Sequence, residues 1–263
     1  MTDGKDPKSR AWDLVGGMFW RLGRESARPS RAEIELFLKD INSRSTCCII
    51  GATTKELIET AIERRMEVTV MDFSEATLED LKGDMAAKEY ESLCIDVLSP
   101  IPQYLLKKQR FILSDRLVNR FTRKDVPNFL RNALAVLAKA GELRITVKLG
   151  LYPMDIALIE EGRSRGTLKQ FYDEETRTLD YAEARAELET RLLPHGRIPR
   201  DVLLQWYQGR GKESRFTDED IQNMLAAAQH HGRSFTRIDR QVCPDAPNTI
   251  LYSAYSDIRE SSR

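Results

Sequence analysis

The chain contains few of the residues that proteins use to hold metal ions or to build disulfide frameworks. Its 263 residues include only three histidines and four cysteines. No two cysteines have CxxC spacing and no two histidines form an HExxH or HxxxH pair, so the common zinc and redox motifs are missing. We therefore expect buried free thiols in a reducing, cytoplasmic protein without a catalytic metal.

An excess of one charge and long apolar runs are also missing. Lys and Arg total 41, as do Asp and Glu, so the formal net charge is zero and no global field favours a polyanionic partner. No apolar run approaches the ~20 residues needed to span a bilayer, and the first residues, MTDGKDPKSR, lack the apolar core of a secretion signal. We expect neither a nucleic-acid partner nor a membrane.

Complete phosphate-binding glycine motifs are absent as well, since the chain has neither GxxxxGK[ST] nor GxGxxG. It does have an apolar strand, a small-residue turn, a helix and a second strand that ends in an acid. These segments are Thr46–Ile50, Gly51–Thr54, Lys55–Arg65, Val68–Met71 and Asp72. A turn at a helix N-terminus can face a charged ligand, and an acid at the tip of the next strand can accept a ribose hydroxyl. The unit predicts a nucleotide-type cofactor at this turn.

The rest of the chain alternates between apolar strands and amphipathic helices, which predicts right-handed crossovers and a mostly parallel sheet with helices on both faces. The last two strands are expected to form an antiparallel hairpin at the sheet edge. We expect strands at 92–95, 110–113, 143–149, 235–242 and 249–255, and helices at 75–84, 126–138 and 218–230.

An N-terminal arm, residues 1–44, precedes the first strand. Apolar spacing predicts helices at 11–22 and 31–41, and Ser30 with Glu33 fits a capping box at the start of the second. The arm either forms a lid over the cofactor or packs against one edge of the sheet. The sequence leaves both alternatives open.

A charged stretch at about 151–215 interrupts the alternation. It is either a helical cap that supplies the substrate side of the site or a solvated connector. Its aromatic residues either line a substrate pocket or simply pack. They are Tyr152, Tyr172, Tyr181, Trp206 and Tyr207.

Seven strands, five of them followed by helices and two paired at the end, resemble the class I S-adenosylmethionine-dependent methyltransferases, and Val70–Ser74 (VMDFS) is similar to the family's second motif. The resemblance implies an α/β fold with a seven-stranded Rossmann-like sheet, mostly parallel, carrying a C-terminal antiparallel hairpin, a helical arm and a helical insertion. It also implies S-adenosylmethionine as cofactor, bound by a domain over 45–255 that contains the insertion, with a tail at 256–263.

The resemblance assigns roles to the strand ends. The loop after the first strand would contact the methionine part of the cofactor, Asp72 the ribose hydroxyls, and Asp96 the adenine amine. Arg28, in an Arg-Pro-Ser element similar to that of some small-molecule methyltransferase-like proteins, would hold the cofactor carboxylate, or it is a surface arginine. The cofactor-binding candidates are Arg28, Gly51, Ala52, Thr53, Asp72, Phe73, Ser74, Asp96, Val97 and Ser114.

The end of the fourth strand would face the reaction. Asp115 is the candidate that orients an amine or takes a proton, and Asn119 the candidate that hydrogen-bonds the substrate. The alternative is that the cluster around them, SDRLVNRF, belongs to a solvated helix face.

Methyl transfer to a small molecule is the leading functional hypothesis, and a homodimer is possible. Gly51 stands alone where the family usually has two or three glycines, so a second hypothesis is attack on the aminocarboxypropyl carbon, by ring closure to azetidine-2-carboxylate or by transfer. A third is a non-catalytic binding module, against which the intact Asp72 and Asp96 argue.

Overall fold

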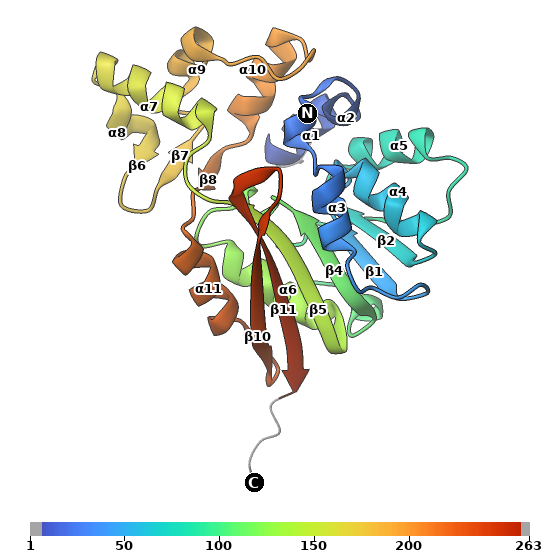
Figure 1. Ribbon diagram of the computed structural model, residues 1–263. Coiled ribbons are helices and arrows are strands. Elements are labelled where there is room, and N and C mark those ends of the chain that lie inside the picture. Colours follow the sequence, from blue (N-terminus) through green and yellow to red (C-terminus); the bar gives the residue numbers. More distant parts are fainter. Residues whose placement is uncertain (1–6, 259–263) are drawn as a thin grey trace.

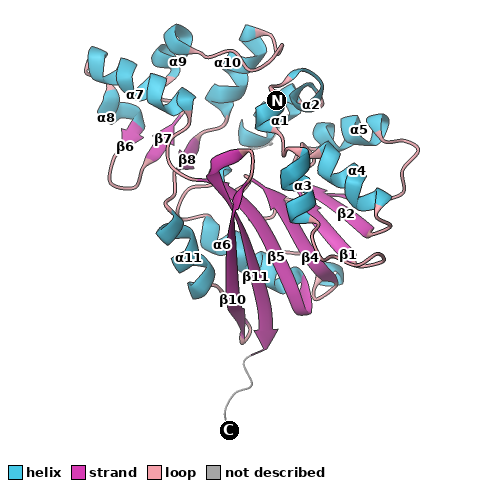
Figure 2. Cartoon of the chain, in the orientation of Figure 1, coloured by secondary structure: helices cyan, strands magenta, loops and turns pink. Residues whose placement is uncertain are grey.

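The computed structural model describes residues 7–258, and their main feature is one twisted sheet (Figures 1 and 2). Within this range the sheet has eight strands in the order β3-β2-β1-β4-β5-β11-β10-β9. The first five pair in parallel, and the last three join by antiparallel pairing. The strands are β1 (Thr46–Ile50), β2 (Glu67–Asp72), β3 (Glu91–Cys94), β4 (Gln109–Asp115), β5 (Leu137–Lys148), β9 (Gln229–His230), β10 (Arg233–Cys243) and β11 (Ala246–Ile258).

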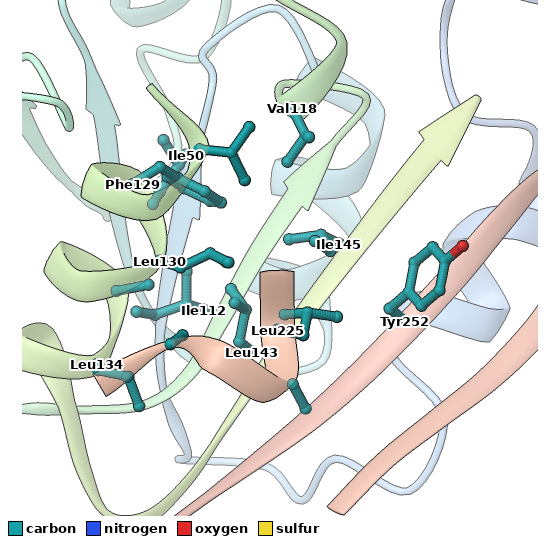
Figure 3. Packing of buried hydrophobic residues seen from close by; sticks show 14 of the residues in the cluster. Ile50, Ile112, Val118, Phe129, Leu130, Leu134, Leu143, Ile145, Leu225 and Tyr252 are labelled. Atoms are coloured by element: carbon teal, nitrogen blue, oxygen red, sulfur yellow. The ribbon is translucent and has the colours of Figure 1, made fainter. Parts of the chain in front are cut away.

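Period-two alternation along β1 divides the core between the two faces of the sheet. Cys47 and Ile49 pack on one face with helices α3, α4 and α5, whereas Cys48 and Ile50 pack on the other with α6 and α11 (Figure 3). The helices are α3 (Arg31–Phe37), α4 (Lys55–Glu63), α5 (Glu75–Asp84), α6 (Val126–Val136) and α11 (Asp218–Ala227). Both faces are covered, as expected for a parallel sheet.

The stretch 151–215 folds into a cap with a buried apolar core, which a solvated connector would lack. Its small antiparallel sheet has the order β6-β7-β8 and was not anticipated from the sequence. The cap lies over one end of the main sheet (Figure 1). Its elements are α7 (Pro153–Arg165), α8 (Leu168–Phe171), β6 (Tyr172–Asp173), β7 (Thr178–Asp180), α9 (Arg185–Arg191), α10 (Arg200–Gly209) and β8 (Lys212–Ser214).

The N-terminal arm has two separately anchored parts. The helices α1 (Pro7–Val15) and α2 (Met18–Leu22) share a buried core with the cap and lie beside α10 (Figure 1). Trp20 of α2 donates its indole N–H to Asp84 of α5 at 2.8 Å. The third arm helix, α3, is held by Arg144 of β5, which donates to the carbonyl oxygens of Phe37 and Lys39 at 2.6 and 2.7 Å. The arm therefore bridges the cap and the sheet.

Several local predictions are confirmed. The strand Thr46–Ile50 and the helix Glu75–Asp84 have the expected bounds. Ser30 and Glu33 form the expected capping box, and Ser74 and Thr217 cap their helices. The antiparallel pair near the end of the chain is also present, with β11 between β5 and β10.

Several of the predicted helices were wrong in extent. The helices expected over 31–41 and 218–230 end at Phe37 and Ala227, and His230 belongs to strand β9. The helix expected over 11–22 breaks at Gly16, which has φ of +38°, and a Cβ there would lie 2.6 Å from an oxygen of Asp80. The helix expected over 126–138 ends at Val136, because Arg233 donates to the carbonyl oxygens of Leu134 and Leu137, both at 2.5 Å. These carbonyls are thereby satisfied without another helical turn.

The first and last residues of the predicted arm and tail are not among the residues that the structure describes. Residues 1–6 of the expected arm and 259–263 of the expected tail lie outside the described residues. Within the described part, β11 extends to Ile258, so the proposed tail begins inside a strand. The helices of residues 7–258 include none with the length and apolar character needed to cross a membrane. Residues 7–258 also form three short 3₁₀ turns: η1 (Glu25–Ala27), η2 (Gln103–Leu105) and η3 (Val118–Arg120).

Candidate functional site

A cavity of about 300 Å³ lies where the parallel strands β1, β2 and β4 end. Loops that follow these strands, the loop after β3, the arm and the cap all contribute walls. The carboxyl edge of an open parallel sheet is the usual place for ligands in such folds. The cavity has one half formed by the strand loops and another formed by the arm, η3 and the cap.

The loop after β1 leaves its backbone open to the cavity. Gly51 has φ of +108°, a conformation that L residues rarely adopt, and a Cβ at this position would meet no atom within 4 Å. Its N–H donates to the carbonyl of Met71 at 2.9 Å, and the Thr54 hydroxyl donates to its carbonyl at 2.9 Å. Gly51 and Thr53 line the cavity. The loop is thus fixed, and its glycine faces free space.

Asp72 joins the loops after β1 and β2. One carboxylate oxygen accepts from the N–H of Ala52 and the other from the N–H of Ser74, both at 2.8 Å. The side chain lines the cavity, yet the residue is only 9% exposed. Burial raises the pKa of Asp72 to about 6, although the backbone donors favour the charged form.

The predicted adenine end of the cavity is formed by the loop after β3. Phe73, Asp96 and Val97 all line the cavity. The Asp96 carboxylate accepts from the N–H of Leu98 at 2.9 Å and from the hydroxyl of Ser99 at 3.1 Å, and it is exposed. Asp96 is thus at the expected place, with its carboxylate closing its own turn. Adenine recognition by Asp96 stays a prediction.

Asp115 lies at the end of β4 and lines the cavity. Its carboxylate accepts from the hydroxyl of Thr146 at 2.5 Å and from Arg116 at 2.8 Å. Arg116, which has φ of +51°, also donates to Glu33 of the arm at 2.5 Å. Burial lowers the pKa of Arg116, but the neighbouring carboxylates Asp115 and Glu33 raise it by more than burial lowers it. The guanidinium therefore stays charged. The arm is thereby held against the end of β4.

Two predicted site residues are engaged elsewhere and are not among the cavity-lining residues. Asn119 is fully buried, and its amide pairs with the backbone N–H and C=O of Lys148 at 2.9 and 2.8 Å. Arg28 donates to Glu56 at 2.6 Å and to the carbonyl of Trp20 at 3.0 Å. This placement supports neither substrate binding by Asn119 nor a cofactor salt bridge from Arg28. Arg28 instead links its segment of the arm to α2 and α4, and Asn119 links η3 to the end of β5.

Three further candidates lie just behind the cavity. Ala52 is fully buried and contributes its N–H to Asp72. Ser74 is fully buried and its hydroxyl contacts Asp13 at 2.7 Å, and Ser114 donates to the carbonyl of Ile50 at 3.1 Å. They shape the loops that line the cavity without lining it themselves.

The second half of the cavity combines cationic and aromatic side chains. Four of the five insertion aromatics proposed as pocket residues line it, whereas Tyr172 is not among the lining residues. Among the cations, only Arg120 belonged to a predicted cluster, SDRLVNRF. The other cations and the arm aromatics were not predicted as lining residues, because no local motif marks them. The lining residues of this half are Lys8, Trp12, Phe19, Arg24, Arg120, Lys148, Tyr152, Tyr181, His195, Trp206, Tyr207 and Arg210.

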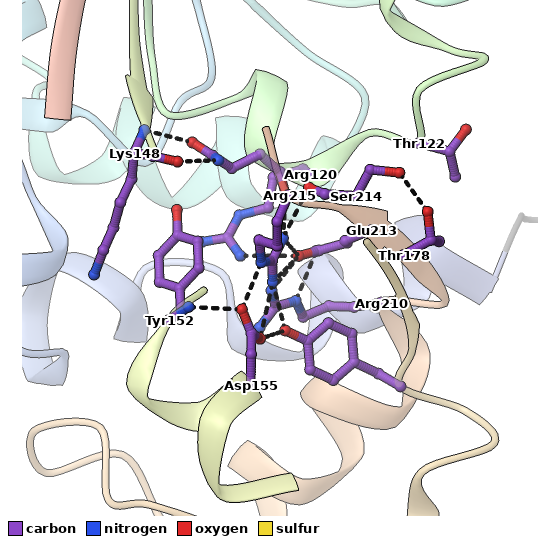
Figure 4. A network of polar contacts seen from close by, with 12 residues as sticks. Arg120, Thr122, Lys148, Tyr152, Asp155, Thr178, Arg210, Glu213, Ser214 and Arg215 are labelled. Atoms are coloured by element: carbon purple, nitrogen blue, oxygen red, sulfur yellow. Dashed lines mark hydrogen bonds and ion pairs between the residues drawn. The ribbon is translucent and has the colours of Figure 1, made fainter. Parts of the chain in front are cut away.

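A buried ionic network lies next to this half of the cavity and links the segments that form it (Figure 4). Arg215 is fully buried and donates to both carboxylate oxygens of Asp155, at 2.5 and 3.0 Å, and to the carbonyl of Asn119 at 3.0 Å. Glu213, also fully buried, accepts from Arg210 at 2.8 Å and from Arg215 at 3.3 Å. Burial alone would raise the pKa of Asp155, but Arg215 lowers it below its usual value. Burial would likewise raise the pKa of Glu213, but Arg210 lowers it well below its usual value, so both acids are ionised.

His195 is an uncharged part of the wall. Burial first, and then the positive charges of Arg24 and Arg120, lower the pKa of His195 to about 4. Its Nδ1 accepts from the N–H of Arg24 at 3.3 Å, so the neutral ring carries its proton on Nε2. The ring stands 5.4 Å from that of Phe19 and 6.1 Å from that of Trp206.

Comparison with solved structures identifies the fold. A Burkholderia thailandensis 1,6-didemethyltoxoflavin N1-methyltransferase, with S-adenosylhomocysteine bound, shares 12% identity over 95% of this chain and 88% of its own, at a TM-score of 0.55. The N-methyltransferase NodS of Bradyrhizobium japonicum WM9, also with S-adenosylhomocysteine bound, shares 11% identity over 96% of this chain and 99% of its own, at a TM-score of 0.53. The chain has the fold of class I S-adenosylmethionine-dependent methyltransferases.

A much nearer relative is a Rhodobacter sphaeroides protein that was provisionally described as a Zn-dependent alcohol dehydrogenase. It shares 39% identity over 98% of this chain and 100% of its own, with a TM-score of 0.88. The chain belongs to the same family as that protein. No protein-family model matches the chain, and no curated protein matches it. Residues 7–258 contain no group of three or more His, Cys, Asp or Glu side chains that could hold a metal ion.

The network under the cavity is expected to carry much of the cap's stability. Changing Arg215→Met should lower the free energy of unfolding by about 3–5 kcal/mol, because the buried Asp155 loses its main partner and the buried Glu213 loses one of its guanidinium contacts. The matched control is Arg163→Met, an exposed arginine of α7, for which we expect less than about 0.5 kcal/mol. Urea unfolding measures both. Equally small changes would contradict the role of the network.

Proposed function

We propose that this protein binds S-adenosylmethionine in the cavity and transfers its methyl group to a small molecule. The observation that carries the proposal is the continuity of the cavity. One half has the open Gly51 backbone and the Asp72 carboxylate at the ends of parallel strands. The other half is closed by the arm and the cap, which leaves room for a small acceptor.

The residues of the first half fit the cofactor. Each carboxylate oxygen of Asp72 accepts one backbone N–H, and each has a further lone pair that could accept a ribose hydroxyl. The space beside Gly51 would admit the amino-acid part, because no side chain projects there. Phe73 and Val97 offer apolar contacts to a flat base.

When bound, S-adenosylmethionine supplies a methyl group that its sulfonium already activates. The chain's task is then to align an acceptor and to exclude water. Trp12 and Phe19 of the arm and Trp206 of the cap would exclude water from the second half. Asp115, held by Thr146 and Arg116 at the boundary between the halves, would orient a donor group of the acceptor.

Zinc-dependent alcohol oxidation, the activity in the description of the Rhodobacter sphaeroides relative, fits these residues less well. A catalytic zinc needs three protein ligands from Cys, His and carboxylates at one point. Among the described residues that line the cavity there is a single histidine and no cysteine. His195 also has one ring nitrogen occupied by the backbone of Arg24.

Product analysis tests the proposal. The protein is incubated with S-adenosylmethionine, first alone and then with a panel of small aromatic acids, phenols and amines, and the products are identified by mass spectrometry. We expect S-adenosylhomocysteine to form only when an acceptor is present. Methylthioadenosine formed without an acceptor would contradict methyl transfer in favour of aminocarboxypropyl or ring-closing chemistry.

The raised pKa of Asp72 makes cofactor affinity depend on pH. Protonation removes acceptor capacity from the carboxyl group, so the affinity for S-adenosylhomocysteine should fall as the pH decreases through about 6. Asp72→Asn should weaken binding at pH 8 by roughly 10- to 100-fold, the size of a lost charge-assisted hydrogen bond, and should abolish this pH dependence. Calorimetry between pH 5 and pH 8 measures both effects.

The control is Asp201→Asn, which changes an exposed aspartate of α10 and should leave the affinity and its pH profile unchanged. A pH-independent affinity in the unmodified protein, or an unaltered profile in Asp72→Asn, would refute the assignment of Asp72 to the ribose.

A further inference from the structure

The second half of the cavity holds more positive than negative charge. Four of the cations that line it are Lys8, Arg120, Lys148 and Arg210. Glu213 accepts from Arg210 at 2.8 Å and lies 3.5 Å from Arg120, so one carboxylate serves both guanidinium groups as well as the buried Arg215. Positive charge that is shielded from water and incompletely paired is costly, and an anionic ligand would relieve this cost.

Within the described residues 7–258, neither of the two lysines has a carboxylate as an ion-pair partner. Within residues 7–258, the Lys8 ammonium donates to the carbonyl of Arg120, and the Lys148 ammonium lies 4.4 Å from the ring centroid of Tyr152. Neither has an ion-pair partner in this range. Burial lowers the pKa of both lysines, and nearby arginines lower it further, whereas Glu213 near Lys8 and Asp155 near Lys148 only partly oppose this effect. Both ammonium groups would therefore gain from a negative charge in the cavity.

Two buried hydrogen-bond donors lining the same half are unsatisfied. The hydroxyl of Tyr152 and the indole N–H of Trp206 are shielded from solvent, and neither has a hydrogen-bond partner among residues 7–258. The pKa of Tyr152 is raised by burial, so the hydroxyl keeps its proton and remains a donor. An unmet buried donor costs about 1–3 kcal/mol, so a ligand with acceptor oxygens would be favoured.

Aromatic rings surround one of the cations. The Arg120 guanidinium lies 5.9 Å from the ring centroid of Trp12 and 5.9 Å from that of Trp206. The two indoles meet edge to face at 5.3 Å, and Phe19 packs against both, at 5.7 and 6.0 Å. Flat apolar walls next to a guanidinium favour a ligand with a planar body and an anionic group.

We propose that the methyl acceptor is a small planar molecule with a carboxylate or phosphate group, which binds Arg120 and Lys148 while its ring lies against Trp12 and Trp206. This inference rests on the proposed function and names the acceptor class for it. Tyr152 and Trp206 would donate to oxygens of the ligand. Asp115, at the boundary with the cofactor half, would face the part of the acceptor that receives the methyl group.

The rival occupant of these cations is the carboxylate of the cofactor itself. The two cases differ in what Arg120→Gln does. If the cations serve the acceptor, this variant keeps its affinity for S-adenosylhomocysteine and loses affinity for the anion. If they serve the cofactor, both affinities fall together.

Calorimetry with benzoate, phenyl phosphate and the neutral isostere benzamide tests the proposal, each titrated into the protein alone and into the protein saturated with S-adenosylhomocysteine. We expect benzoate or phenyl phosphate to bind at least tenfold more tightly than benzamide, and the preferred anion identifies the group. Arg120→Gln and Lys148→Gln should each weaken anion binding at least tenfold. Arg163→Gln, on the exposed face of the cap, should leave it unchanged.

The proposal is overturned if neither anion binds, if benzamide binds as tightly as the anions, or if Arg120→Gln weakens S-adenosylhomocysteine as much as it weakens the anion. Titration of S-adenosylhomocysteine alone separates the two claims. Its failure to bind would refute the proposed cofactor even where the anions bind, and its binding without anion binding would refute only the acceptor class.

Discussion

The buried guanidinium of Arg215 is the contact on which the arrangement of the cavity depends. It binds Asp155 at the start of the cap, Glu213 at the end of the cap and the carbonyl of Asn119 after β4. A buried charge is tolerated only when partners surround it on all sides. The three segments must therefore keep one mutual position, which fixes the cap over the carboxyl edge of the sheet.

The arm completes the cavity by packing into both units. Trp12 and Phe19 enter the core of the cap, whereas Glu33 of α3 binds Arg116 at the end of β4. Arg116 in turn holds Asp115. The two ends of the site are thus positioned by contacts between segments more than eighty residues apart in the sequence. A preformed cavity of this kind lowers the ordering cost of binding a small ligand.

Local physics made much of the fold predictable from the sequence. The apolar run of β1, the small-residue turn after it and the acid at the end of β2 mark the nucleotide-binding unit, and the capping box at Ser30 depends on residues only three apart. Asp72 was identifiable as a site residue for the same reason, since its position at a strand end places it at the cavity.

What the sequence could not reveal depends on tertiary partners. Arg28 and Asn119 were candidates on the sequence alone. In the structure, Arg28 binds Glu56 of α4, and the amide of Asn119 pairs with the backbone of Lys148. The cations Lys8, Arg120 and Arg210 come from three separate elements and meet only in the folded chain. A periodic pattern in the sequence does not show which distant segments come into contact. The net positive charge of the second half of the cavity was therefore not predicted.

The most direct measurement for the central claim is a crystal structure of the protein with S-adenosylhomocysteine. The account predicts the ribose hydroxyls within about 2.7–3.2 Å of the Asp72 carboxylate, the amino-acid part beside Gly51, and a free space at Arg120 and Trp206. Density for the ligand away from Asp72, or its carboxylate bound to Arg120, would contradict the account.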